Sequence, residues 1–176
     1  MRLVLMSDTH LPRRARDLPP QLWAAVDDAD VVVHAGDWVS LEFMTRLEAR
    51  TTAHGGRLIG VWGNNDGDDL RARLPEVARV DLDGLRLAVV HETGPAAGRE
   101  KRMAGAFADA DVVVFGHSHI PWDSYAGPGG PRLLNPGSPT DRRRQPAGTY
   151  LTAGCEPGRD GRGVLTDVRE HRIATP

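Results

Sequence analysis

Side chains that can bind metal ions follow five apolar segments of the sequence. These candidate ligands are Asp8, His10, Asp37, Asn64, His91, His117 and His119. The apolar segments are typical of short buried strands of a parallel sheet. Because ligands bind at the carboxyl ends of the strands in α/β sheets, we expect the seven side chains to meet at one edge.

Two of the candidates stand two residues apart, in the segment VVVFGHSHIP at residues 112–121. Gly116 lets the backbone turn after the apolar run. If the backbone stays extended beyond it, His117 and His119 point the same way and Ser118 points away. This pairing of imidazoles at a strand end indicates a metal site.

Seven ligands are too many for one tetrahedral ion and suit two ions about 3.5–4 Å apart with a shared carboxylate. Mixed imidazole and oxygen ligands favour manganese, iron, zinc or similar ions over calcium or magnesium. A structural zinc site would have fewer ligands, usually with thiolates. Taken singly, these Asp and Asn residues are typical of helix caps and turns, so the metal interpretation depends on the joint pattern.

The elements that must position these residues alternate between strands and helices. Apolar runs predict strands at 3–7, 30–34, 57–62, 85–91 and 111–115. Helical spacing predicts helices over 18–29, 40–50 and 96–109, the second with Ser40 as its N-cap. This alternation predicts a parallel sheet with right-handed crossovers.

The last third of the chain has a different pattern. Short strand-like segments are separated by turns rich in Gly and Pro, which is typical of antiparallel strands. They lie at 123–127, 132–138, 148–154 and 163–170. Residues 77–90, with the turn Asp83-Gly84, predict a hairpin. We therefore expect one α/β domain over residues 1–176, with a parallel half and an antiparallel half.

The composition narrows the class of protein. A chain of 176 residues with 40% hydrophobic residues and a net charge of -2 gives no general reason to expect nucleic acid or an anionic membrane as partner. The single cysteine, Cys155, excludes an internal disulfide and a cysteine-based zinc cluster. No apolar run has the length of a signal peptide core or a membrane span, so we expect a cytoplasmic location.

The motifs DTH, GD, GNND, a single histidine and GHSH occur in that order along the chain. In this order they resemble those of the calcineurin-like metallophosphoesterases, and NPGS at 135–138 resembles the small bacterial and archaeal phosphodiesterase branch. The resemblance spans residues 3 to about 168. It implies a four-layer α/β/β/α sandwich with a dinuclear metal site at the carboxyl ends of the strands.

The resemblance also implies a ligand set for each ion. The first ion would be held by Asp8, His10 and His119, the second by Asn64, His91 and His117, and both by Asp37. His117 and His119 would therefore bind different ions of the pair. The implied cofactor is two divalent metal ions, manganese before iron, zinc or nickel.

Two cations can lower the pKa of a bridging water and neutralise charge on the phosphoryl oxygens. The expected function is therefore phosphodiester hydrolysis by a metal-bridging hydroxide, which makes the protein a hydrolase of phosphoric ester bonds. Asp37, Asn64 and His117 are the expected catalytic residues. Asn65 stands where many members of the superfamily have histidine, and an amide cannot deliver a proton. We therefore expect action on diesters or good leaving groups rather than on alkyl monoesters.

Four further residues are candidates for supporting the ligands or contacting the substrate. They are Asn65, Asp66, Glu92 and Arg142. Asp66 either holds the loop of Asn64 or only forms a turn. Glu92 follows His91 where the family commonly has glycine, and it either orients that histidine or faces solvent. Arg142 begins a run of three arginines that either steadies a phosphate or faces water.

Two alternatives to a phosphodiesterase remain open. One is a non-catalytic metal-binding scaffold on the same fold, as in the retromer subunit that resembles these phosphoesterases, although the complete ligand set favours an enzyme. The other is a nucleotide or protein monoester phosphatase, which Asn65 disfavours. The expected partner is a small phosphate ester, with neither membrane nor nucleic acid, and the family analogy leaves a homo-oligomer open.

Overall fold

A computed structural model describes residues 1–158 and 161–173 of the chain as ten strands and four helices. The strands are β1 (Arg2–Met6), β2 (Val31–His34), β3 (Arg57–Gly60), β4 (Val77–Leu82), β5 (Leu85–Val90), β6 (Val112–Phe115), β7 (Trp122–Tyr125), β8 (Arg132–Asn135), β9 (Gly148–Pro157) and β10 (Gly163–Ile173). The helices are α1 (Pro20–Asp27), α2 (Leu41–Ala53), α3 (Asp68–Arg71) and α4 (Arg99–Ala106). Every strand and helix expected from the sequence is present, with shifted ends.

The helix ends follow from local sequence. The first residue of α1 is Pro20, whose fixed φ suits the start of a helix. The hydroxyl of Ser40 accepts a hydrogen bond from the backbone N–H of Phe43 at 3.2 Å, which confirms the predicted N-cap of α2. The helix α4 begins three residues later than expected, because Gly98 has a φ of 70° and this left-handed conformation cannot be part of an α-helix.

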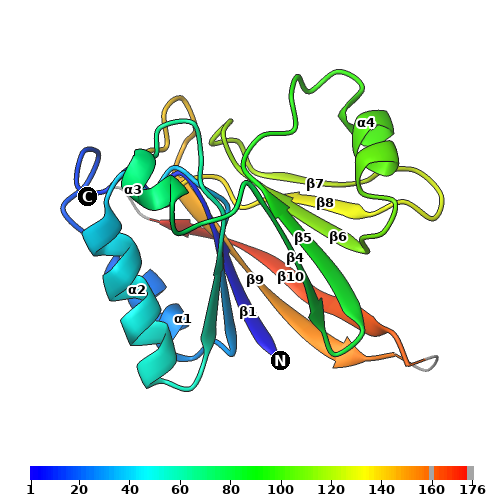
Figure 1. Ribbon diagram of the computed structural model, residues 1–176, viewed down its shortest axis with the longest axis horizontal. Helices are drawn as coiled ribbons and strands as arrows, with labels where there is room; N and C mark the ends of the chain where they lie inside the picture. The colour runs from blue at the N-terminus through cyan, green and yellow to red at the C-terminus, as the bar shows by residue number, and fades with distance from the viewer. Residues whose placement is uncertain (159–160, 174–176) are drawn as a thin grey trace.

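The strands form two five-stranded sheets (Figure 1). In the first sheet the order is β10-β9-β1-β2-β3, and β1, β2 and β3 are parallel. In the second sheet the order is β4-β5-β6-β8-β7, and β5, β6 and β8 are parallel. The N-terminal strand β1 is thus central in its sheet, between β2 and the late strand β9.

The expected division into a parallel half and an antiparallel half is wrong. Both sheets are mixed. In the first sheet β9 is antiparallel to its neighbours β1 and β10, and in the second sheet the edge strands β4 and β7 are antiparallel to β5 and β8. The C-terminal segments divide between the sheets, with β7 and β8 in the second and β9 and β10 in the first. The cause is the hairpin of β4 and β5, which does not extend the first sheet but begins a second one that packs against it.

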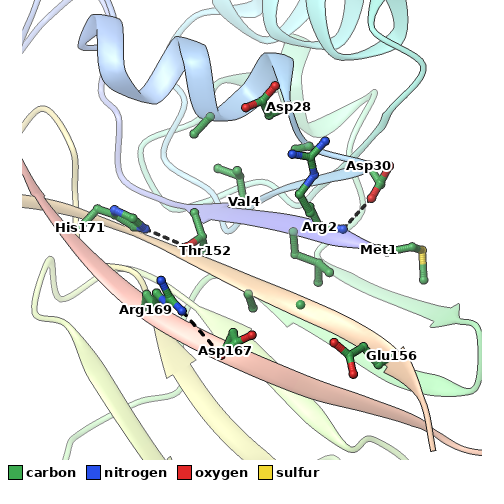
Figure 2. A pocket seen from close by; sticks show the side chains of 15 residues that line it. Met1, Arg2, Val4, Asp28, Asp30, Thr152, Glu156, Asp167, Arg169 and His171 are labelled. Carbon is green, nitrogen blue, oxygen red and sulfur yellow. Dashed lines mark hydrogen bonds and ion pairs between the residues drawn. The ribbon is translucent and has the colours of Figure 1, made fainter.

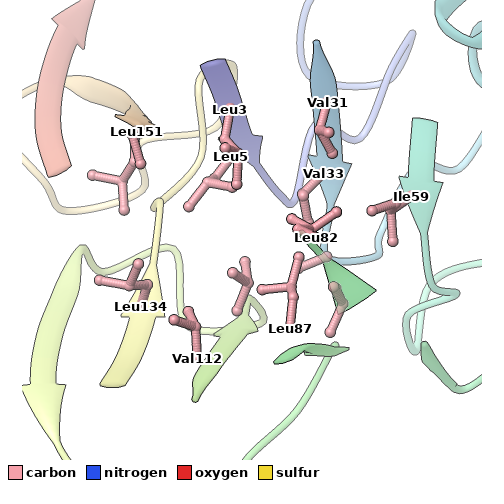
Figure 3. Close-up of a cluster of buried hydrophobic side chains, with 14 of the residues drawn as sticks. Leu3, Leu5, Val31, Val33, Ile59, Leu82, Leu87, Val112, Leu134 and Leu151 are labelled. Atoms are coloured by element: carbon pink, nitrogen blue, oxygen red, sulfur yellow. The ribbon is translucent and has the colours of Figure 1, made fainter. Parts of the chain in front are cut away.

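Three apolar clusters separate four layers, in the order helices, sheet, sheet, helix. Between the sheets, Leu5 and Val33 of the first sheet pack with Leu87 and Val112 of the second (Figure 3). Residues that alternate with these along the strands pack outward, under α1 and α2 on one side and under α4 on the other (Figure 1). Burial on both faces explains the uninterrupted apolar strands, since each fully buried leucine contributes about 1.5–3 kcal/mol.

None of the helices in the described part of the chain has the length and apolar character that crossing a bilayer requires. The longest helix, α2, has 13 residues and a charged outer face.

Candidate metal centre

All seven candidate ligands lie just beyond the carboxyl ends of parallel strands, as predicted. The first sheet supplies four of them from the segments after β1, β2 and β3, and the second sheet supplies three from the segments after β5 and β6. Five are buried, namely Asp8, His10, Asp37, His91 and His119. Asn64 is exposed and His117 is half-buried, so the cluster opens to solvent on their side.

The backbone of this edge is not extended, which corrects the expectation for His117 and His119. Their φ angles are 69° and 59°, and Asp8, His10 and Asp37 also have positive φ angles, between 46° and 60°. Such conformations cost of order 1–3 kcal/mol each and occur where the surrounding structure fixes them. Here the sharp turn after each strand brings the side chain inward. Both imidazoles reach the cluster, by a turn rather than by alternation along a strand.

One group of ligand atoms comes from Asp8, His10 and His119. The Nε2 atoms of His10 and His119 are 3.2 Å apart, and the Nε2 of His119 lies 3.4 Å from Oδ1 of Asp8. The Asp8 carboxylate accepts hydrogen bonds from the hydroxyl of Ser7 at 2.6 Å and from the backbone N–H of His117 at 3.0 Å. These bonds fix the carboxylate so that its oxygen faces the histidines.

A second group lies around Asp37. Its Oδ1 is 3.4 Å from Nε2 of His91, and its Oδ2 is 3.5 Å from Nε2 of His10. The Oδ1 of Asn64 is 2.9 Å from both Nε2 of His91 and Nδ1 of His117. Asp37 therefore contacts one histidine of each group. The ligand atoms of Asp8, Asp37 and His91 also lie within 4.8 Å of one another, so the two groups form one continuous cluster.

Two of the imidazoles have their tautomers fixed by backbone carbonyls. The Nδ1 of His91 donates to the carbonyl of Ala35 at 2.7 Å, and the Nδ1 of His119 donates to the carbonyl of Asp141 at 2.6 Å. In the neutral ring, each Nε2 is then left with a lone pair directed into the cluster. This is the arrangement that a metal-binding histidine requires.

The electrostatics of the cluster also favour a cation. Burial raises the pKa of the Asp8 carboxyl to about 7, although attraction to His91 opposes this. Burial also raises the pKa of the Asp37 carboxyl, but hydrogen bonding and attraction to His91 outweigh burial and hold that pKa well below its usual range. In the described chain, neither carboxylate has a lysine or arginine as an ion-pair partner. The residues therefore fit divalent ions, which would supply the missing positive charge.

Burial lowers the pKa of three histidines of the cluster, but its net effect differs among them. For His91 burial lowers the pKa, but hydrogen bonding to Asp37 and the attraction of Asp8 outweigh it and raise the pKa to about 8. Burial lowers the pKa of His119 to about 4, and it also lowers the pKa of His10. These two rings are neutral at pH 7, which is the form that binds metals.

Glycine is required where the backbone approaches the ligands most closely. A Cβ on Gly116 would lie 2.7 Å from Oδ2 of Asp8 and 2.9 Å from the carbonyl oxygen of Ala35. Both distances are shorter than van der Waals contact allows, so a larger residue would displace the Asp8 carboxylate. The glycine of the GHSH motif is thus needed for two reasons: it allows the turn, and it leaves room for the Asp8 carboxylate.

Two of the supporting candidates hold Asp37 in place. Asn65 donates from its backbone N–H to Oδ1 of Asp37 at 2.8 Å and from its amide to Oδ2 at 2.6 Å. The buried carboxylate of Asp66 accepts from the backbone N–H groups of Asp37, Val39 and Gly63 at 2.7–3.0 Å. Asp66 therefore joins the loop of Asp37 to the loop of Asn64, as the loop-holding interpretation predicts.

The other two candidates differ from expectation in their neighbours. Glu92 lies beside His117 rather than His91, with its Oε1 3.9 Å from Nε2 of His117. Arg142 is exposed and donates to the carbonyl of Gln145 at 2.8 Å. The following residue, Arg143, is the one directed to the cluster, with Nη1 3.5 Å from the carbonyl oxygen of His117. Because Arg142 and Arg143 are adjacent in a run of three arginines, the sequence gives no indication of which one is directed to the cluster.

A cavity of about 570 Å³ lies away from this edge. It lies at the opposite end of β1, where Met1 and Arg2 line it together with Asp28, Asp30 and His171 (Figure 2). Its charged side chains come from several elements and include Asp167 and Arg169, which form an ion pair across 3.8 Å. The metal-binding atoms are all at the other end of the strand, so this cavity is separate from the candidate centre.

Comparison with known proteins gives consistent matches over most of the chain. Residues 1–158 match the model of the calcineurin-like phosphoesterase superfamily domain. A probable metallophosphoesterase from Methanothermobacter thermautotrophicus is 32% identical over 147 residues, which cover 80% of this chain and 78% of that protein.

Two solved structures are similar to almost the whole chain. A protein of Thermotoga maritima has a TM-score of 0.71 and 27% identity, with 98% of this chain and 99% of the other covered. Wild-type Vps29 of Entamoeba histolytica, solved in complex with Zn²⁺, has a TM-score of 0.71 and 19% identity, with 98% of each chain covered. At 19% identity, the match to the Entamoeba histolytica protein shows only that the two chains share a fold.

Proposed function

The chain belongs to the calcineurin-like phosphoesterase superfamily, and we propose that it is a phosphodiesterase that acts on a small phosphodiester with two divalent metal ions. The observation that carries this proposal is the convergence of seven side chains with metal-binding atoms at one sheet edge. Residues 1–176 are proposed to act as one domain, because the cluster between the sheets includes both Leu3 and Cys155.

The proposed ligand sets follow the two groups of contacts. One ion would be bound by Asp8, His10 and His119, the other by Asn64, His91 and His117, with Asp37 shared. The shared role of Asp37 is supported by its contacts with one histidine of each set. Mixed nitrogen and oxygen ligands suit manganese, and the zinc complex of the Entamoeba histolytica protein makes zinc the alternative. When bound, such ions neutralise phosphoryl oxygens and lower the pKa of a water molecule.

In the proposed reaction the oxygen of water bonds to phosphorus, and the bond from phosphorus to one ester oxygen breaks. The electron pair of that bond leaves with the ester oxygen, and the two protons of water end on the departing alcohol and on the monoester product. His117 is half-buried at the rim and would orient the phosphate there. Asn65 cannot act as an acid, and its amide is bonded to Asp37. The leaving oxygen therefore takes its proton from solvent, which favours groups that leave as stable anions.

The test is hydrolysis of bis(p-nitrophenyl) phosphate beside p-nitrophenyl phosphate, by protein that has been treated with chelator and reloaded with manganese. We expect metal-dependent cleavage with preference for the diester. Asp37→Asn and His117→Ala should each reduce it by at least about a hundredfold, since each removes a proposed ligand.

Matched controls are Asp68→Asn and His54→Ala, which make the same changes at exposed positions outside the cluster. Both controls should keep wild-type turnover. Protein that binds two manganese ions but cleaves neither substrate would refute the proposal and favour a scaffold. A preference for the monoester would instead favour a phosphatase.

A further inference from the structure

A second pocket, of about 360 Å³, shares a wall with the candidate centre. His117 and Glu92 line it on the side of the centre, and its other lining residues include Trp122 of β7, Pro95 and Arg99. Arg99 is the first residue of α4, so the pocket lies between the start of that helix and the second sheet. Any molecule held at His117 therefore has this pocket beside it.

Arg99 is a buried cation without a carboxylate partner. The residue is 6% exposed, and in the described chain it forms no ion pair within 4.0 Å. Its guanidinium makes one long hydrogen bond, from Nη2 to the carbonyl of Gly94 at 3.5 Å, and its Nε has none. Burial of the group also lowers the pKa of Arg99. By contrast, Arg86 and Arg132 each form two hydrogen bonds to a nearby aspartate.

Two aromatic rings hold this guanidinium in place. Its Cζ lies 4.8 Å from the centre of the Phe115 ring and 4.6 Å from the centre of the Trp122 ring. The indole N–H of Trp122 donates to the hydroxyl of Ser124 at 2.8 Å, and that hydroxyl donates to Glu100 at 3.1 Å. This network fixes the indole and uses one oxygen of Glu100. The Glu100 carboxylate attracts Arg99, but in the described chain it forms no ion pair with it within 4.0 Å.

A buried, unpaired charge is costly, and apolar residues would fill this space at lower cost. The N–H groups of a guanidinium all lie in its plane, and in Arg99 the Nε–H has no hydrogen-bond partner in the described chain. The edge of this plane suits a planar or tetrahedral anion, which can accept two parallel hydrogen bonds. Glu92 does not supply this anion, since its side chain is 56% exposed and lies beside His117.

We propose that this pocket binds the second substituent of the phosphodiester and that Arg99 binds an anionic group, a carboxylate or a phosphate, on that substituent. The proposal rests on the proposed function, because it places the scissile phosphate at His117. It names the substrate class as diesters with a second anionic group on one arm. Trp122 and Pro95 would contact the apolar part of that arm.

The test compares two synthetic diesters with the same leaving group, p-nitrophenyl phenyl phosphate and p-nitrophenyl 3-carboxyphenyl phosphate. We expect the wild-type protein to have a kcat/KM about 10- to 100-fold higher for the carboxylated diester, as one charge-assisted bidentate contact allows. In Arg99→Gln this ratio should fall to about 1, and Arg99→Lys should recover only part of it. Lys101→Gln removes the same charge from an exposed position on the same helix and should keep the wild-type ratio.

A second measurement does not depend on turnover. Benzoate added to zinc-loaded protein should shift the NMR signals of the Arg99 Nε–H and the Trp122 indole N–H, and Arg99→Gln should abolish the indole shift. Turnover of the uncarboxylated diester tests the proposed function separately. If that diester is cleaved but the carboxylate gives no preference, or if benzoate shifts neither signal, the assignment of the pocket is overturned while the phosphodiesterase stands.

Discussion

The substitution Asp66→Asn should weaken the candidate centre although it replaces none of the candidate ligands. The Oδ2 of Asp66 accepts from the N–H groups of Asp37 and Gly63, at 3.0 and 2.7 Å, and its Oδ1 accepts from the N–H of Val39 at 2.7 Å. Asparagine keeps the shape of the side chain but offers one oxygen in place of two. At best two of the three bonds survive, and the new NH₂ group faces a backbone donor.

The magnitude follows from these three bonds. A hydrogen bond to a charged acceptor contributes about 1.5–3 kcal/mol and one to a neutral acceptor about 0.5–1.5 kcal/mol. The substitution removes one bond of the first kind and weakens two. Burial raises the pKa of Asp66 above its usual value despite the three hydrogen bonds, which means that burying this charge is costly. Removing the charge therefore offsets part of the stability lost with the hydrogen bonds. We expect a decrease of about 2–4 kcal/mol in the free energy of unfolding.

The assay is urea unfolding of the chelator-treated protein, followed by calorimetric titration with manganese. Besides the loss of stability, we expect affinity for manganese to fall by about 10- to 100-fold, as for other residues that support metal ligands. Asp68→Asn is the control, since it makes the same change at an exposed position two residues away and should stay within about 0.5 kcal/mol of wild type. If Asp66→Asn behaves like this control in both assays, then Asp66 does not hold the two loops together.

Three further predictions address the backbone, the core and the cysteine. Gly116→Ala should lower manganese affinity at least about tenfold in calorimetry, because its Cβ would lie 2.7 Å from Oδ2 of Asp8, whereas Gly105→Ala, with open space around it, should not. Leu87→Ala should lower the free energy of unfolding by about 2–5 kcal/mol in urea, since this 2% exposed side chain fills the space between the sheets, and a loss under about 1 kcal/mol would contradict that packing. Burial raises the pKa of the Cys155 thiol, and the residue is only 3% exposed. At pH 8 a thiol reagent should therefore label the native protein at least about a hundredfold more slowly than the unfolded chain. Equal rates would show that strand β9 is open.

The sequence alone could predict the strands, because their burial on both faces leaves uninterrupted apolar runs such as residues 112–115. It could also predict that polar residues beyond these runs would converge, since parallel strands end at a common edge. Which sheet each strand joins could not be predicted from the runs. Pairing between distant strands, such as β1 with β9, depends on packing across the whole chain.

The residues around the cluster are harder to predict than the candidate ligands. The three backbone donors that face Asp66 become visible only when two loops are placed side by side. Arg99 has no signal in the sequence, because an arginine at the start of a helix is normally exposed. Its burial between two aromatic rings depends on the distant strands β6 and β7. Local patterns therefore identify the polar residues that meet at this edge but not the pocket beside them.

The central place of β1 has a consequence for biosynthesis. The ribosome makes β1 long before one of its two neighbours, β9, which begins at Gly148. All seven candidate ligands are synthesised before that strand, so the nascent chain carries them while one edge of an apolar strand is still unpaired. Such an edge can pair with another chain, which makes the growing polypeptide prone to aggregation until β9 emerges. Closure of the sheet beside Asp8 must therefore wait until β9 has been made.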